Sequence, residues 1–263
     1  MIRQTFNLHT HTARCGHATG LDQQYIDSAI KAGFKLLGFS EHIPYPEMRL
    51  PNCRMFYEHK EEYLQTMKQL KKTYRGQIDI IYGYEVEYTQ DHVSYLMEMK
   101  KDCDYMILGQ HCKYFGYEYD CYCSDEDVIA YTTQIEQALE KGFITYIAHP
   151  DYFMMGRRTF SSVCEEAAHR IARASILHDI PLEINLNGIS YGKKNYCIGT
   201  KTEDRYPYPF REFWEIISTY GCKILYGYDA HSPIIFHEQN RLIETDIILR
   251  DLLLNFVDHI QIK

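Results

Sequence analysis

The chain has 263 residues, of which 45% are hydrophobic, and its formal net charge at pH 7 is −8. This length suits a single α/β barrel, and the acidic balance argues against a broad nucleic-acid-binding face, which needs clustered Lys and Arg. The sequence has no apolar run of membrane-spanning length, and its amino terminus has no apolar core typical of a signal peptide. We therefore expect neither a nucleic-acid partner nor a membrane partner.

The cysteines indicate a reducing compartment. There are nine of them, an odd number, and no two are spaced as a CxxC pair. We interpret them as reduced thiols, most of them buried as small hydrophobic side chains, in a cytoplasmic protein.

Seven short apolar runs, each bounded by polar residues, Gly or Pro, predict β-strands. In chain order they are residues 6–9, 36–40, 78–87, 105–110, 144–148, 181–186 and 222–228. Amphipathic patterns between and after them predict helices over residues 21–32, 58–74, 124–142, 161–178, 210–220 and about 238–255. This alternation predicts parallel βαβ units, and such units can form either an open sheet or a closed barrel.

Ligand-type side chains stand at or just past the carboxyl ends of six of the seven predicted strands. They are His9 and His11, His42, Glu85 and Glu87, His111, His149, and finally Asp229 with His231. An open sheet gathers ligands at one switch point from two or three strands. Convergence from six strands therefore favours a closed barrel of seven strands with its site at the C-terminal face. Strand six, with the sequence LEIN, is the doubtful contributor.

A metal centre is the chemistry that this set of side chains favours. The candidate ligands are His9, His11, His17, His42, Glu85, His111, His149, Asp229 and His231. Nine ligands are too many for one or two four-coordinate ions, but with one carboxylate bridging two metals they serve three. Mixed imidazole and carboxylate ligands suit Zn, Fe or Mn. Cys15 and Cys112 lie beside ligand histidines, and we expect Cys112 to pack behind the site because strand neighbours point to opposite faces.

The order of these motifs resembles the PHP (polymerase and histidinol phosphatase) domain family. The pattern is an HxH after the first strand, a third His six residues on, EH after the second strand, then E, H, H and a final DxH. The resemblance covers residues 1–263 as one domain and implies a distorted (β/α)7 TIM-like barrel with a trinuclear centre. It further implies one metal at His9, His11, Glu85 and Asp229, a second at Glu85, His111 and His149, and a third at His17, His42 and His231.

Within this family, "THTARCGHATG" and "GFSEHIP" look most like the histidinol-phosphatase branch. That resemblance implies a phosphoric monoester hydrolase acting on L-histidinol phosphate in histidine biosynthesis. Physically, a metal-bound water with a lowered pKa would attack phosphorus, with Glu85 and Asp229 as catalytic ligands. No motif for a protein nucleophile is present: we find neither Cys-x5-Arg nor a serine elbow.

Several loop residues are candidate substrate contacts. Arg157 and Arg158, after strand five, are the preferred phosphate clamps, because a guanidinium matches a phosphate dianion. Weaker candidates are Lys113, Lys193, Lys194 and Arg205. The acidic, aromatic segment 113–122 and Asp151 are expected to meet the ammonium and imidazole groups of the substrate. Gln110 is bulkier than we expect beside His111 and leaves the substrate open.

Other functions remain possible on the sequence alone. The same chemistry could act on a sugar, nucleotide or diester phosphate. An amidohydrolase-type metal hydrolase also begins with HxH, but it has eight strands and a carboxylated Lys after strand four, where this chain has His111. A non-catalytic binding module is a third possibility. The sequence predicts neither the native metal nor the oligomeric state.

Overall fold

The computed structural model describes residues 4–262 and contains one parallel sheet of eight strands. The sheet order is β1-β2-β3-β4-β7-β9-β12-β13. The bounds are Phe6–Asn7, Leu36–His42, Asp79–Val86, Tyr105–Leu108, Tyr146–Ile147, Leu182–Asn185, Lys223–Gly227 and Asn255–Phe256. The first seven strands are the seven predicted from the apolar runs, so the expected βαβ succession is confirmed.

The sheet curls until its first and seventh strands meet. Beyond the assigned ends of β1 and β12, Thr10 pairs with Ala230 in a parallel bridge. The backbone N–H of His11 donates to the carbonyl of Ala230 at 3.0 Å, and the N–H of Ala230 donates to that of His9 at 3.1 Å. Strand β13 pairs with the opposite end of β12, at Lys223 and Ile224. The seven-stranded barrel is therefore closed at its C-terminal end, and β13 is an addition at the other end.

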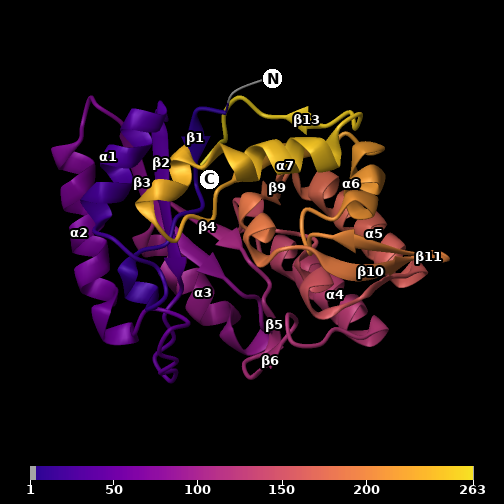
Figure 1. Cartoon of the computed structure of the whole chain (residues 1–263). Coiled ribbons are helices and arrows are strands. Elements are labelled where there is room, and N and C mark those ends of the chain that lie inside the picture. The colour runs from indigo at the N-terminus through magenta and orange to yellow at the C-terminus, as the bar shows by residue number, and fades with distance from the viewer. Residues whose placement is uncertain (1–3, 263) are drawn as a thin grey trace.

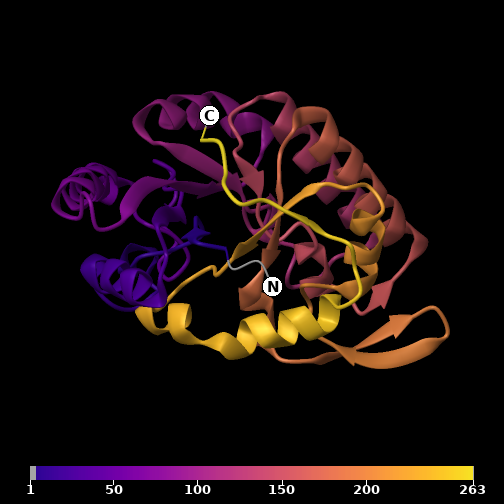
Figure 2. The ribbon, with the colours of Figure 1, turned by 90° about the horizontal axis from the view of Figure 1, so that it is seen from above.

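Helices surround the strands, as the view along the barrel shows (Figure 2). Their bounds are Asp22–Ala32 for α1, Lys60–Thr73 for α2, Val93–Met99 for α3, Asp125–Glu140 for α4, Ser162–His178 for α5, Arg211–Ser218 for α6 and Gln239–Leu249 for α7. Residues predicted to begin and end helices do so in the structure. Ser124 caps α4 by accepting from the N–H of Asp127, and Gly33 ends α1 with a φ of 91°. The last helix is shorter than predicted, because residues 255–256 form β13 instead.

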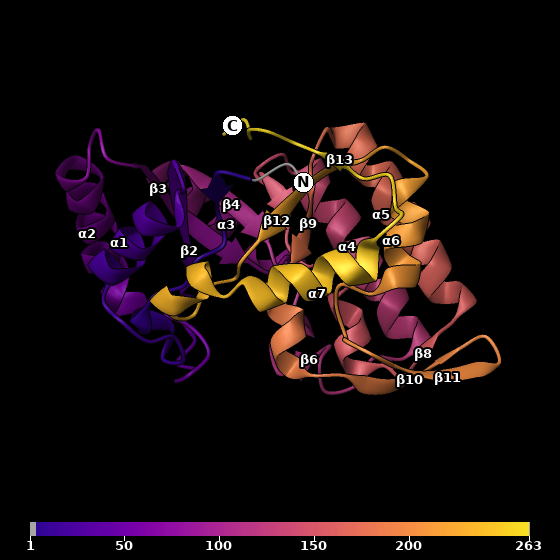
Figure 3. The ribbon, with the colours of Figure 1, turned by 45° about the horizontal axis from the view of Figure 1, so that its top comes forward.

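Two small sheets extend the barrel (Figure 1). The hairpin β5–β6 comprises Cys112–Tyr114 and Tyr117–Glu118. A three-stranded sheet contains β8, Thr159–Phe160, with the antiparallel pair β10, Lys194–Ile198, and β11, Lys201–Arg205. This pair projects from the body of the molecule (Figure 3). The apolar-run analysis did not predict these strands, because their residues are mostly polar and partly exposed.

Two hydrophobic clusters hold the barrel together. A small one, with members Phe6, Leu8, Tyr105, Ile107 and Leu225, comes from β1, β4 and β12 and fills the barrel interior. A larger one lies between the strands and the helices. Within residues 4–262 no helix is both long and apolar enough to cross a membrane. The interior cluster closes the barrel below the strand ends, so the polar side chains there form the floor of a cavity and not a pore.

Candidate metal centre

Glu85, near the end of β3, is the centre of the site. Five histidine nitrogens surround its carboxylate: those of His149 at 2.9 Å, His42 at 3.0 Å, and His9, His11 and His111 each at 3.4 Å. A side chain on Gly109 of the neighbouring segment would collide with this carboxylate. The packing therefore reserves space for Glu85 to face histidines from the ends of four other strands, β1, β2, β4 and β7.

His9, His11 and Asp229 form the first candidate group. The ligand atoms of these three buried side chains lie within 4.8 Å of one another. An Asp229 oxygen is 3.2 Å from Nε2 of His11 and 3.5 Å from Nε2 of His9. The backbone pairing of residues 9–11 with Ala230 brings β1 and β12 together here. The backbone pairing that closes the barrel therefore also brings His9, His11 and Asp229 together.

His111 and His149 lie on the other side of Glu85, with ring centroids 5.0 Å apart. The compact groups around them differ from the predicted second site. Glu85 and His149 group with His9, whereas Glu85 and His111 group with His42. Glu85 is common to both groups, as a bridging carboxylate requires.

His17, His42 and His231 form the outer part of the site. The ring centroids of His17 and His231 are 4.6 Å apart, and those of His17 and His42 are 5.4 Å apart. His231 also groups with His11 and His42, and separately with His17 and Cys15. Cys15 is therefore within reach of this group, while the buried Cys112 belongs to none of the groups found among residues 4–262.

Unpaired polar atoms test whether these side chains suit a metal. Within residues 4–262, buried atoms with no hydrogen-bond partner include Nε2 of His9, His11 and His231, Nδ1 of His149, Oε2 of Glu85 and Oδ1 of Asp229. An unpaired buried polar atom is costly, and native structures contain few of them. These six atoms lie together at the strand ends and are all of metal-ligand types. The residues therefore fit divalent metal ions.

Two further carboxylates orient histidines from behind. Glu183 accepts from Nδ1 of His9 at 2.9 Å, and Glu87 accepts from Nδ1 of His111 at 3.0 Å. Such contacts fix the ring tautomer and leave Nε2 free for a metal. Glu41 lies 3.7 Å from Nδ1 of His11, beyond hydrogen-bond distance. Glu183 belongs to LEIN, the strand that the sequence left doubtful. The sequence did indicate a role for Glu183, because it is an acidic residue on a largely apolar strand.

The acidic residues are ionised in spite of burial. Burial raises the pKa of Glu85, but the surrounding charges of His111, His9 and His42 hold it well below its usual range. Burial likewise opposes ionisation of Asp229, and His9 and His11 outweigh it, so that its pKa is also well below the usual range. For Glu87, Arg54 and His111 overcome burial and lower the pKa to about 2. The site therefore offers carboxylates in the form that binds cations.

The backbone is strained at two of the predicted ligands. His149 has φ 30° and Asp229 has φ 46°, values that side chains other than glycine rarely adopt. Each residue lies two positions past the end of a barrel strand, β7 or β12. Strain of this kind persists where surrounding structure imposes it, and it clusters at functional sites.

A cavity of about 500 Å³ opens above the floor. Glu118 and Asp120, from the segment expected to meet the substrate, line it together with Tyr152, Tyr191 and Tyr208. Arg54, which the sequence analysis missed, also lines it and is the one Lys or Arg among its described lining residues. Both guanidinium NH groups of Arg54 contact Glu87, at 3.1 and 3.3 Å. Arg54 does not stand at the carboxyl end of a strand and belongs to no motif, so the sequence pattern did not indicate that it lines the cavity.

The preferred phosphate clamps lie outside this cavity. Arg157 is buried and donates to Asp125 at 2.6 Å and to the carbonyl of Cys123 at 3.0 Å. Arg158 donates to the carbonyl of Met155 at 3.0 Å and lies over the ring of Tyr196. Neither lines the metal cavity. The geometry does not support the clamp prediction, because both guanidinium groups are bound to the protein's own structure.

The remaining candidates also have structural partners. Lys113 pairs with Asp127 at 2.8 Å. Asp151 accepts from the N–H of Phe210 and from Trp214, and its pKa is raised to about 7, mainly by burial. The side chain of Gln110 bonds backbone groups of Tyr88 and Cys112. The long side chain of Gln110 therefore has a structural role.

Lys193 and Arg205 line a different pocket, and none of Lys113, Lys194, Asp151 or Gln110 lines the metal cavity.

Comparison with known proteins identifies the class. The PHP domain family matches residues 7–187, more than half of the chain, and the chain belongs to this family. It is 25% identical over 238 residues to a probable histidinol-phosphatase of Deinococcus radiodurans, covering 86% of this chain and 85% of that protein. It is 32% identical over 128 residues to the histidinol-phosphatase of Bacillus subtilis, covering 45% of this chain and 48% of that protein.

A solved structure shares the fold. The histidinol phosphate phosphatase of Lactococcus lactis, crystallised with Zn, L-histidinol and phosphate, superposes with a TM-score of 0.70 at 17% identity. The match covers 98% of this chain and 99% of that chain. The distorted PHP-type barrel is therefore the fold of this chain.

Proposed function

We propose that this protein is a metal-dependent phosphomonoesterase that hydrolyses L-histidinol phosphate. The observation that carries the proposal is Glu85, buried among five histidine nitrogens at the floor of an open cavity. The names of the Deinococcus radiodurans and Bacillus subtilis relatives support the substrate. The ligands of the Lactococcus lactis structure support both the substrate and a divalent metal.

We further propose three divalent ions, of Zn, Fe or Mn, held by the nine predicted ligands. The unpaired ligand atoms on both sides of Glu85 and at His231 support more than one ion. His111 and His149 would share one ion with Glu85, and His9, His11 and Asp229 another. His17, His42 and His231 would hold the third, and Cys15 is near enough to join them.

Bound divalent metals lower the pKa of water and neutralise charge on phosphoryl oxygens. The chain's own contribution is to hold the ligands in place. Glu183 and Glu87 orient the rings of His9 and His111, and the closed barrel keeps the floor rigid. Substrate atoms therefore meet a preorganised site, which lowers the cost of reaching the transition state.

The outer part of the cavity suits the cationic end of histidinol phosphate. Glu118 and Asp120 supply carboxylates for an ammonium or imidazolium group, and Tyr152, Tyr191 and Tyr208 supply ring faces.

We also propose that residues 1–263 act as one PHP-type domain. The family match ends at residue 187, but Asp229 and His231 complete the candidate ligand groups from β12. The cytoplasmic location inferred from the cysteines stays a prediction.

The decisive experiment is turnover of histidinol phosphate beside a panel of sugar, nucleotide and diester phosphates. We expect the highest kcat/KM for histidinol phosphate, with metal required. A preference for another phosphate ester would contradict the substrate while retaining the chemistry. Hydrolysis of amides without phosphatase activity would favour the amidohydrolase alternative.

A further inference from the structure

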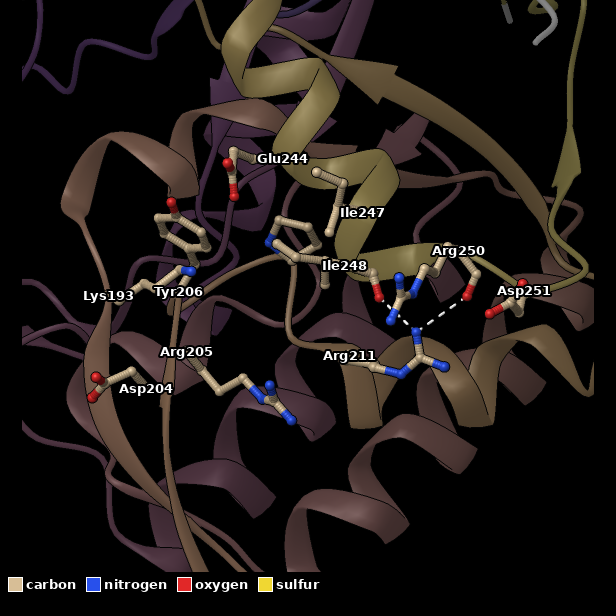
Figure 4. Close-up of a pocket in the computed structure, with 11 residues that line it drawn as sticks. Lys193, Asp204, Arg205, Tyr206, Arg211, Glu244, Ile247, Ile248, Arg250 and Asp251 are labelled. Atoms are coloured by element: carbon tan, nitrogen blue, oxygen red, sulfur yellow. Dashed lines mark hydrogen bonds between the residues drawn. The ribbon is translucent and has the colours of Figure 1, made fainter.

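A second polar pocket lies outside the metal centre, between the β10–β11 hairpin, α6 and the end of α7 (Figure 4). Its volume is about 480 Å³. Four of its lining residues are cationic, Lys193, Arg205, Arg211 and Arg250, and three are acidic, Asp204, Glu244 and Asp251. Arg205 pairs with Glu203 and Glu212, and Arg211 pairs with Glu215, so Arg250 is the arginine of this pocket that has no salt bridge within residues 4–262.

Arg211 has a fixed orientation in this pocket. Its guanidinium donates to the carbonyl oxygens of Ile248 at 2.7 Å and Arg250 at 3.2 Å, where α7 ends, and to Glu215 at 2.8 Å. Binding to helix-end carbonyls places a positive charge at the negative end of the helix dipole. The group is therefore held rigidly by the fold, as a binding site requires.

Arg250 faces Arg211 without a counter-ion. Figure 4 shows the two guanidinium groups directed toward each other. No salt bridge between Arg250 and a carboxylate is found among residues 4–262. Arg211 already has Glu215 as its counter-ion, and its Nε and Nη1 donate to Glu215 and to the two carbonyl oxygens, so its Nη2 remains to donate to a ligand. An oxyanion between the two groups would accept from this Nη2 and from the guanidinium of Arg250.

The rest of the pocket suits the body of a small molecule. Ile247, Ile248 and Pro209 provide apolar surface next to the arginines. At the far side Tyr206 lies beside Glu244, whose charge adds to the effect of burial in raising the pKa of Tyr206. Lys193 lies over the same ring, 5.2 Å from its centroid. The far side can therefore receive a polar group.

We propose that this pocket binds a small molecule with an oxyanion, either carboxylate or phosphate, at one end and a short apolar body. The oxyanion would lie between Arg211 and Arg250, and the body would lie along Ile247 and Ile248. The site is separate from the metal centre, so this proposal is independent of the proposed phosphatase function.

The pocket and the metal cavity share two chain segments. Tyr191 lines the metal cavity and Lys193 the second pocket; Tyr208 lines the metal cavity, and Tyr206 and Pro209 the second pocket.

Helix α7 makes a further connection. Its Arg241 donates to Asn187 at 2.9 Å, and Asn187 donates to Asp229 at 3.2 Å. A ligand in the second pocket therefore contacts elements that also position the metal centre.

Calorimetric titration of the metal-loaded protein tests the site, with pentanoate and propylphosphonate as separate probes. We expect at least one probe to bind wild type at a site whose affinity Arg250→Gln lowers about tenfold, the loss of one charge-assisted hydrogen bond. Arg211→Gln combined with Arg250→Gln should abolish it. The probe that binds more tightly identifies carboxylate or phosphate as the ligand group.

Arg75→Gln is the matched control, because it removes an exposed arginine beyond α2. It should bind as wild type does. Propylphosphonate can also bind the metal centre, and that event should persist in all three variants. Titrations that are the same for wild type and Arg250→Gln, or an equal loss in Arg75→Gln, would overturn the proposal. Arg250 is exposed, so its replacement tests binding without disturbing the fold.

Discussion

The metal cavity has a floor and a wall that differ in construction. The floor consists of His9, His11, Glu85 and His149, which are at most 2% exposed and lie at strand ends. The wall, with Glu118, Asp120 and Tyr191, comes from the short β5–β6 hairpin and from segments beyond the strand ends, and it is partly or fully exposed. The parallel strands of the barrel hold the floor, while a two-stranded hairpin and individual side-chain contacts hold the wall. The difference suggests that the floor sets the chemistry and the wall sets which substrate is accepted.

Replacing Glu85 with Gln should have the largest effect, because it removes the charge shared by the floor. We expect kcat for phosphate ester hydrolysis to fall on the order of 10³-fold, and bound metal to fall with it. Glu126→Gln, on an exposed face of α4, is the control. Steady-state kinetics measures kcat, and metal analysis measures the bound metal. Near-normal turnover would refute the bridging role of Glu85.

His17→Ala tests the edge of the floor. His17 is exposed and groups with His231 and Cys15, apart from Glu85. We expect this variant to lose one bound metal and to keep the other two, as measured by mass spectrometry of metals after exchange into metal-free buffer. Loss of every metal would mean that the outer group is not an independent site.

The two buried arginines should behave differently. Arg54→Gln leaves the buried Glu87 carboxylate without its partner, so the ring of His111 loses its orientation. Metal affinity should fall about 10–100-fold. Arg157→Gln should lower the melting temperature but leave metal affinity and KM close to wild type, because Arg157 bonds Asp125 outside the cavity.

A chelator competition assay and a thermal melt separate these effects. If Arg157→Gln bound a normal amount of metal but its kcat/KM fell sharply, the prediction that Arg157 clamps the phosphate would be supported instead.

Asp127 supports the wall and should give the smallest effect. It accepts from Lys113 at 2.8 Å and Tyr117 at 2.9 Å, and it completes the cap of α4. Burial raises its pKa, but Lys113 and the Ser124 N–H lower it more, to about 2. A depressed pKa stabilises the fold above the unfolded value near 4, and this contribution disappears as pH falls toward 2.

We therefore expect Asp127→Asn to lower the free energy of unfolding by about 1 kcal/mol at pH 7 and by much less near pH 2. Denaturant unfolding at several pH values measures this. A cost that does not change with pH would indicate lost packing and not lost charge.

The same contrast explains what could be predicted from the sequence. The floor was predictable because a period-two strand that ends in His, Asp or Glu must present that residue at the barrel rim. The seven strands follow from the apolar runs, and the convergence of eight of the nine candidate ligands follows from that rule; His17 lies in a loop beyond the first strand. Glu183 could have been included, since it is an acidic residue on a buried strand.

The wall was predictable only in part: the acidic, aromatic segment 113–122 was expected to meet the substrate, and its Glu118 and Asp120 line the cavity. Arg157 and Arg158 follow strand five, but the chain then turns so that Asp125 and the carbonyl of Cys123 bind Arg157. Arg54 reaches the cavity from a loop between β2 and α2, far in sequence from its partner Glu87. Such positions depend on long-range contacts that no local pattern contains. The hairpin β10–β11 was missed for a similar reason, since its strands carry little apolar alternation.

The central claim is that one barrel floor holds three metals around Glu85. The most direct test is the metal content of protein purified without chelator, measured per chain by inductively coupled plasma mass spectrometry. The account predicts about three divalent ions per chain, of Zn, Fe or Mn, in keeping with nine ligands and one bridge. One ion or none per chain, in protein that is fully folded, would contradict it.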